Sequence, residues 1–167
     1  LKIRDKFPNS ILLESSDYHG NDNSFSYICF NPIANFIVKD NQIIKNYPDL
    51  SNEKHIANSK NIASEIDQFI KEFITEDLNS FSFISNGLFG YTTYDAVKYF
   101  ESIEISKKHS NLNLPEIYYS IYQNIIAIDH FKNKAYIFSH CYKADSNIEE
   151  IHQLIIMNRY GTYNFNT

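Results

Sequence analysis

The chain has 167 residues, with 15 basic and 20 acidic side chains and a formal net charge of −5, and its apolar content of 43% is enough for the core of one domain. No basic stripe is present that could follow a phosphate backbone, which argues against nucleic-acid binding. No apolar run approaches the ~20 residues that a membrane-spanning helix needs, so we expect a single domain, residues 1–167, that binds neither nucleic acid nor a membrane.

The first predicted strand covers residues 24–30, where side chains alternate and Phe25 and Tyr27 share one face. Both faces of this segment carry apolar residues, which is typical of a strand buried on two sides. We expect the strand to end at Asn31 and Pro32, because proline has no N–H to donate to a neighbouring strand.

A hairpin and a helix are predicted next. Residues 36–38 and 42–44 flank the polar sequence Lys-Asp-Asn, whose Asp and Asn tolerate the backbone of a tight turn. Between residues 59 and 75, apolar residues recur every three or four positions, which predicts a helix with one apolar stripe. The stripe consists of Ile62, Ala63, Ile66, Phe69, Ile70, Phe73 and Ile74.

The second half of the chain predicts a turn, a short helix and a longer hairpin. Gly87 and Gly90 indicate a close backbone turn before a short helix at residues 94–101. Residues 117–129 and 134–142 are rich in Tyr, Ile and Phe and surround a polar turn, which favours a second hairpin.

The last predicted element is a helix that begins near Ser146, because Ser146 and Glu149 have the spacing of a capping box. Its apolar residues are Ile148, Ile151, Leu154 and Ile155. Together these elements predict an α+β fold, in which a mainly antiparallel β-sheet built from hairpins is packed by helices.

Cysteines and histidines do not form a recognisable site in the sequence. Cys29 and Cys141 are too few for a disulfide scaffold or a four-ligand zinc site, and they favour a reducing cytoplasm. His140 next to Cys141, with His130 on the facing strand, is the nearest approach to a metal cluster, but neighbours on a strand point to opposite faces. No motif places a base beside Cys141. We therefore predict no metal site and no catalytic residue in this chain.

Four segments carry a resemblance to a known family. They are ILLES at residues 11–15, SFSYICFNPIANF at 24–36, GLFGYTTYDAVKYFE at 87–101 and LPEIYYSIYQNIIAIDHFKNKAYIF at 114–138. They resemble the N-terminal domain of anthranilate synthase component I, a lyase of tryptophan biosynthesis that makes anthranilate and pyruvate from chorismate and ammonia or glutamine. Because family members are roughly three times as long, the resemblance implies an N-terminal regulatory domain that lacks its catalytic domain and is inactive alone.

The resemblance also implies a binding site for L-tryptophan, the feedback inhibitor of the family. The LLES segment matches without a gap, so Leu13, Glu14 and Ser15 are expected to line this pocket, with Glu14 pairing with the ammonium, Ser15 hydrogen-bonding and Leu13 covering the indole. Phe25 and Ser26 fall at positions that can wall the pocket. Family members usually carry an arginine where this chain has Ser24.

The remaining expectations concern the parent enzyme. The missing chorismate-binding domain is expected to hold magnesium, so no cofactor is expected in this chain. The expected partners are L-tryptophan, the chain's own C-terminal catalytic domain and a glutamine amidotransferase subunit. In the segment at residues 87–101, Asp95 near the start of a helix favours the helix dipole and caps free amides, which gives it an architectural role.

Two alternatives stay open. Component I of aminodeoxychorismate synthase, from folate biosynthesis, shares this domain and can hold tryptophan as a structural ligand; the intact LLES segment favours the feedback-regulated enzyme. A non-enzymatic interaction domain, in which sheet edges and the tyrosine-rich hairpin dock a partner, predicts no amino-acid binding at all.

Overall fold

The computed structural model describes residues 2–14, 24–58, 61–73, 81–103, 113–141 and 147–157. Its strands are β1 (Ile11–Glu14), β2 (Phe25–Lys39), β3 (Gln42–Asn46), β4 (Asn52–Ile56), β5 (Leu88–Thr92), β6 (Ile117–Asp129) and β7 (Lys134–Ser139). Its helical segments are α1 (Lys2–Lys6), α2 (Ile62–Lys71), the 3₁₀ helix η1 (Tyr94–Tyr99) and α3 (Ile148–Ile156). None of the helices within these ranges is long and apolar enough to cross a membrane.

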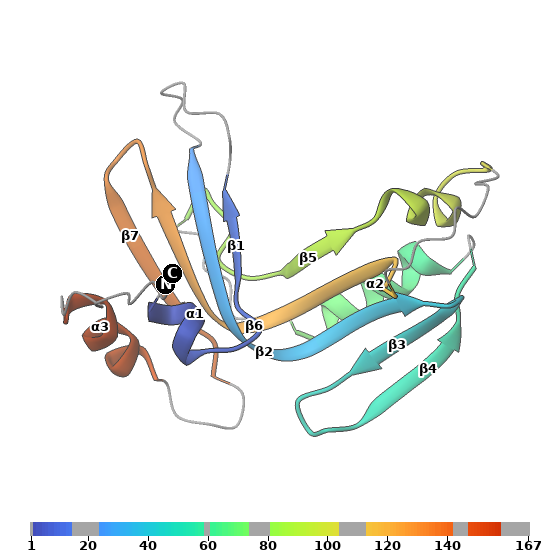
Figure 1. The fold of residues 1–167 in the computed structure, drawn as a ribbon, viewed down its shortest axis with the longest axis horizontal. Coiled ribbons are helices and arrows are strands. Elements are labelled where there is room, and N and C mark those ends of the chain that lie inside the picture. The colour runs from blue at the N-terminus through green and yellow to red at the C-terminus, as the bar shows by residue number, and fades with distance from the viewer. Residues whose placement is uncertain are drawn as a thin grey trace, which may run out of the picture. The chain divides into compact units, whose positions relative to one another are not determined.

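The strands form one sheet in the order β4-β3-β2-β6-β5, with β1 paired to β2 and β7 paired to β6 (Figure 1). The pairs β1–β2, β2–β3, β3–β4, β5–β6 and β6–β7 are antiparallel. This arrangement confirms the predicted α+β class with a mainly antiparallel sheet.

The chain divides into two compact units that share its two longest strands. The first unit contains Leu1–Asn31 and Gln123–Thr167, and the second contains Pro32–Tyr122. Strand β2 therefore passes from the first unit to the second, and β6 passes back.

The sequence predicts that this strand ends at Asn31 and Pro32. In the structure, β2 continues to Lys39. Asn31 has a φ of 59°, in the left-handed region that asparagine tolerates better than most residues. A residue with positive φ can introduce a local kink into a strand. The strand can then continue past Pro32, although Pro32 has no N–H to donate. The Asn31 side chain also donates a hydrogen bond to the Gln123 side chain on β6.

In the second unit, the predicted first hairpin is present as β2 and β3, with Val38 paired to Ile43 and Lys39 paired to Gln42. The two residues between the strands, Asp40 and Asn41, have φ values of 50° and 59°. Positive φ at both positions is the requirement of the hairpin turn that matches the right-handed twist of paired strands. The local sequence therefore accounts for this hairpin.

Helix α2 confirms the predicted helix, although its buried stripe is narrower than expected. Ile62 and Phe69 are buried, whereas Ala63 and Ile70 are exposed, and Ile74 lies outside the described residues. The second-unit core contains Ala34, Phe36, Val38, Ile43, Ala57, Ile62, Phe69, Ala96, Tyr99, Ile117 and Ile121.

The glycine-containing motif forms strand β5 and the 3₁₀ helix η1 rather than a turn followed by a helix. Gly90 pairs with Tyr119 of β6, and a Cβ at Gly90 would overlap the backbone carbonyl of Tyr118. Only glycine therefore allows this close approach of the two strands. At the end of η1, the Tyr99 hydroxyl donates a hydrogen bond to the Glu116 carboxylate at 2.6 Å, and burial together with that carboxylate raises the pKa of Tyr99.

In the first unit, α1 and α3 lie on the same side of the paired strands (Figure 1). Phe30, Ile126 and Ile151 form the buried cluster, and Ile3 and Phe7 of the N-terminal segment pack against it. The rings of Phe7 and Phe30 have centroids 4.8 Å apart. Further contacts come from Ile28, Ile128 and Ile137, and an ion pair joins Lys6 to Glu150.

The second hairpin, β6 and β7, is present as predicted, although β7 ends at Ser139. The Asp129 carboxylate accepts a hydrogen bond from the Lys132 backbone N–H at 2.9 Å, which stabilises the connecting turn. Helix α3 has Asn147 at its N-cap position, and the predicted capping residue Ser146 lies outside the described residues.

Candidate functional site

Strands β1 and β2 bring most of the predicted effector residues together at one end of the sheet. Their register pairs Leu13 with Tyr27 and Glu14 with Ser26. Glu14 is the last residue of β1, and Phe25 is the first residue of β2, so the candidates lie where one strand ends and the next begins. Ser15 lies outside the described residues.

The same register divides these residues between the two faces of the sheet. Directly paired residues project from the same face, and successive residues of a strand project from opposite faces. Glu14 and Ser26 therefore share one face, and Leu13 shares the other with Phe25 and Tyr27. The rings of Phe25 and Tyr27 stack with centroids 6.2 Å apart.

The face that carries Glu14 and Ser26 is the face on which α1 and α3 pack. Ile28 lies two residues after Ser26 on β2 and therefore projects from the same face. Ile28 packs against the buried cluster that includes Ile151 of α3. Glu14 is nevertheless exposed at the edge of this face, and its carboxylate has no hydrogen bond or ion pair within the described part of the chain.

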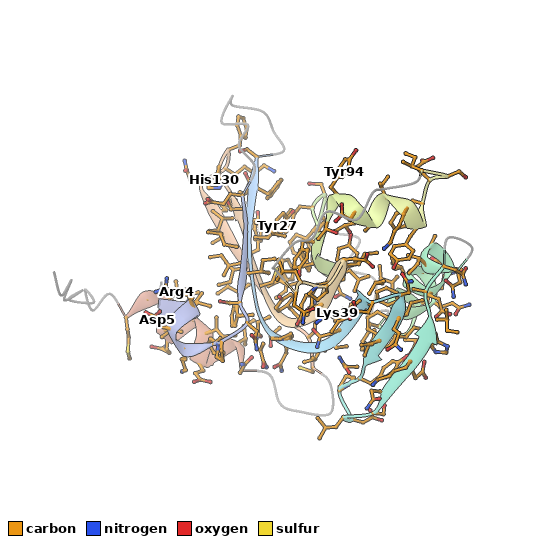
Figure 2. The ribbon with its side chains drawn as sticks, turned by 45° about the vertical axis from the view of Figure 1, so that its right-hand side comes forward. Arg4, Asp5, Tyr27, Lys39, Tyr94 and His130 are labelled. Atoms are coloured by element: carbon orange, nitrogen blue, oxygen red, sulfur yellow. The ribbon has the colours of Figure 1, made fainter. Side chains whose placement is uncertain are left out.

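The structure adds His130, which the sequence suggests only as a poor metal ligand. Its Nε2 atom lies 2.7 Å from the hydroxyl oxygen of Ser26, which is only 3% exposed, and its backbone N–H donates to the Ser24 carbonyl at 3.0 Å. His130 follows β6, the neighbour of β2, and Figure 2 shows it at the end of the sheet beyond Tyr27. The pairing of β2 with β6 brings the two residues together, and no local signal in the sequence reveals that pairing.

Glu14 on β1, Ser26 on β2 and His130, the first residue after β6, therefore form a polar row. The row offers a carboxylate, a hydroxyl and an imidazole on one face of the sheet. A carboxylate binds ammonium groups, and an imidazole N–H binds anionic oxygens.

The cysteines remain outside this row. Cys29 is fully buried, and burial raises the pKa of its thiol to about 12, which makes it a poor nucleophile. Cys141 is exposed. Within the described ranges, no group of three or more His, Cys, Asp or Glu side chains could hold a metal ion.

The segment at residues 87–101 places its polar residues in the second unit, where they support the fold. Asp95 lies in the first turn of η1, where a negative charge is favourable. The N-cap position is Thr93, whose hydroxyl donates to the Glu116 carbonyl at 3.1 Å instead of capping the helix. Lys98 forms an ion pair with Glu116.

The chain is similar to known proteins in both sequence and fold. A family model described as chorismate binding enzyme matches residues 9–160. "Probable anthranilate synthase component 1" from Schizosaccharomyces pombe is 29% identical over 94 residues, which are 56% of this chain and 19% of that protein. The crystal structure of anthranilate synthase component I from Streptococcus pneumoniae TIGR4 matches with a TM-score of 0.58 and 15% identity, covering 87% of this chain and 30% of that chain.

The chain therefore spans less than a third of the length of either protein. At 15% identity, the structural likeness concerns the fold alone.

Proposed function

Because the chain belongs to the chorismate binding enzyme family, we propose that it forms the N-terminal regulatory domain of an anthranilate synthase component I. The sequence similarity to the probable anthranilate synthase component 1 of S. pombe supports this assignment. The four motifs that resemble the N-terminal domain all lie within the matched residues 9–160. The chemistry on chorismate would belong to the catalytic domain of the longer enzyme, and this chain alone would be inactive.

The regulatory role is to bind L-tryptophan at the end of the sheet where β1 ends and β2 begins. The observation that supports it best is the pairing of Glu14 with Ser26, which places an exposed carboxylate beside a hydroxyl on one face. Glu14 would accept hydrogen bonds from the ammonium of the amino acid. Leu13 and Phe25 project from the opposite face, so they would contact the ligand where it extends past the strand ends, and Ser15 would supply a further hydroxyl.

Inhibition in the longer enzyme would be allosteric. L-tryptophan would bind better to the domain arrangement that is poor at catalysis and would shift the population toward it. By linkage, chorismate would weaken tryptophan binding by the same factor.

The other proposed partners are the catalytic domain and a glutamine amidotransferase subunit, in the cytoplasm. Magnesium is expected in the catalytic domain, and no step of this proposal involves it. Among the described residues, no group of three or more His, Cys, Asp or Glu side chains could hold a metal ion.

The absence of tryptophan from the chain provides a direct test. Titration of the chain into a fixed amount of L-tryptophan, excited where tyrosine hardly absorbs, should increase the ligand's fluorescence anisotropy to saturation. L-phenylalanine should not displace the ligand. Because a hydrogen bond to a charged group contributes about 1.5–3 kcal/mol, Glu14→Gln should raise the Kd roughly 10- to 150-fold.

Glu53→Gln is the matched control, because Glu53 is an exposed carboxylate on the edge strand β4 of the other unit. It should bind L-tryptophan like the unmodified chain. Saturable binding that survives Glu14→Gln unchanged would show that the site lies elsewhere. If the chain binds no L-tryptophan, the regulatory proposal fails for this chain, and a non-enzymatic interaction domain becomes the better reading.

The family description makes chorismate the second ligand to test. Calorimetric titration of the chain with chorismate should give no heat of binding if the chorismate site lies in the rest of the longer enzyme. Saturable binding of chorismate by this chain would contradict its assignment as a purely regulatory domain. Aminodeoxychorismate synthase component I, the other enzyme with this domain, would be distinguished by assaying the longer protein for its product.

A further inference from the structure

We propose that Asn86 is a modification site, which deamidates without an enzyme in the folded chain when the backbone nitrogen of Gly87 attacks its side chain. Of the four glycines in the sequence, Gly87 is the one that follows an asparagine. An Asn-Gly pair is the least hindered for this reaction, because glycine has no side chain beside the attacking nitrogen. Both residues belong to the second unit, so the inference does not depend on the proposed effector site.

The reaction has two steps and needs only a base and water. In the first step, the Gly87 nitrogen loses its proton to a base and forms a bond with Cγ of Asn86. The bond between Cγ and Nδ2 breaks, and Nδ2 takes up a proton and leaves as ammonia, so a succinimide ring remains. In the second step, water opens the ring at one of its two carbonyl carbons. One opening gives aspartate, and the other gives isoaspartate.

The first support is that the structure holds the two reacting groups next to each other. The Gly87 backbone N–H donates a hydrogen bond to Oδ1 of Asn86 at 2.8 Å. Because Cγ is bonded to this oxygen at about 1.23 Å, the attacking nitrogen lies within about 4 Å of Cγ. Rotation within Asn86 can therefore bring the two atoms together while the chain stays folded.

The second support is the open space around Gly87. Its φ is 148°, a value that residues with a side chain rarely adopt. A Cβ added at Gly87 would meet no atom within 4 Å. Asn86 and Gly87 are also only partly buried, so base and water reach them. The surroundings thus leave room for the ring to close and for water to open it.

The modification has a structural consequence, because Asn86 ties the end of α2 to the start of β5. Its Nδ2 donates a hydrogen bond to the backbone carbonyl of Phe73 at 3.1 Å, and the ring of Phe73 lies 5.2 Å from the ring of Phe69 in the core. A carboxylate cannot donate, so aspartate loses this bond and sets a negative charge beside a carbonyl oxygen. Isoaspartate also adds a carbon to the main chain just before Leu88, the first residue of β5.

The test compares the deamidation rate of Asn86 in the folded chain with that in guanidinium chloride, both in a mildly alkaline buffer that supplies the base. Mass spectrometry of the tryptic peptide 72–98 measures the conversion, and fragmentation locates the converted residue. If the reaction required unfolding, the folded chain would react slower by the equilibrium constant of unfolding, about 10³-fold or more. We expect the two rates to agree within about tenfold.

Asn41 is the control within the same chain, because it is exposed in the β2–β3 turn and precedes Gln42, whose side chain hinders the attack. It should stay unconverted while Asn86 reacts. For the consequence, Asn86→Asp should lower the urea midpoint of unfolding. The matched variant Asn52→Asp, at an exposed position of β4, should leave the midpoint unchanged.

The remaining outcomes each contradict one part of the proposal. A folded chain that converts Asn86 more slowly than the expected range would show that the fold protects this residue, and the modification site would be rejected. Equal conversion of Asn41 and Asn86 would mean that the Gly87 geometry does not direct the reaction. Equal urea midpoints for Asn86→Asp and Asn52→Asp would show that Asn86 does not hold α2 to β5.

Discussion

The two cysteines differ in burial, so we expect their thiols to differ in reactivity. Cys29 is fully buried on β2 with a thiol pKa of about 12, and Cys141 is exposed. Because the thiolate is the reactive form, we expect one thiol per native chain to react with Ellman's reagent at pH 8, and two after unfolding in denaturant. In the variant Cys141→Ser, the native chain should be unreactive. Rapid reaction of this variant in its native state would show that Cys29 is accessible.

At this scale, local sequence patterns identify part of the candidate site. The motif at residues 11–15 and the alternation at 24–30 are local patterns, and they located Glu14 and Ser26 at neighbouring positions. Which of the motif residues share a face depends on strand register, and register is decided by pairing with β2 rather than by the motif itself. His130 was missed for the same reason: it is 104 residues from Ser26 in sequence and joins it through the neighbouring strand β6.

At the scale of elements, a nearly buried ion pair joins β3 to α2. Lys45 Nζ lies 2.8 Å from Glu65 Oε2, and the two side chains are 5% and 18% exposed. Removing one partner of a buried pair leaves an uncompensated charge and costs about 3–5 kcal/mol. We expect Lys45→Met to lower the free energy of unfolding by up to this amount, as measured by urea denaturation.

The double variant Lys45→Met, Glu65→Leu should recover much of that loss, because it leaves no unpaired charge in the interior. The exposed pair Lys71–Asp67 on the outer face of α2, at 2.5 Å with side chains 63% and 61% exposed, is the matched control. Lys71→Met should change stability by no more than about 0.5 kcal/mol. Equal effects of the two lysine variants would show that Lys45 is hydrated in solution.

Elements with a strong local pattern were predicted from the sequence, and elements that depend on distant partners were not. Helix α2 and both hairpins carry periodicity or turn residues that act within a few positions. Strand β4, by contrast, is exposed at every position and has no apolar alternation, because it is an edge strand held by backbone pairing to β3. Gly87 and Gly90 predict a turn where the structure has strand β5, because Gly90 serves close packing against β6 rather than chain reversal.

At the scale of the whole molecule, the division into two units bears on the prediction of a single domain. Strand β2 carries Phe30 in the core of the first unit and Phe36 in the core of the second, and both side chains are fully buried. The predicted end of the strand at Asn31 and Pro32 coincides with the boundary between the units, and the observed strand crosses it. A continuous strand that contributes to two cores favours cooperative unfolding, because disorder that begins in one core removes strand pairing at the border of the other.

We therefore expect the chain to unfold in one transition, with coincident urea curves from circular dichroism and tyrosine fluorescence. Phe30→Leu and Phe36→Leu are a matched pair in the two cores, and each should cost roughly 0.5–3 kcal/mol. If the units unfold together, each variant moves the whole curve to lower urea, whichever probe is used. Two transitions, one sensitive only to Phe30→Leu and the other only to Phe36→Leu, would mean that each unit folds by itself. The chain would then consist of two domains, and the proposed effector site, which lies in the first unit, would be expected to survive loss of the second core.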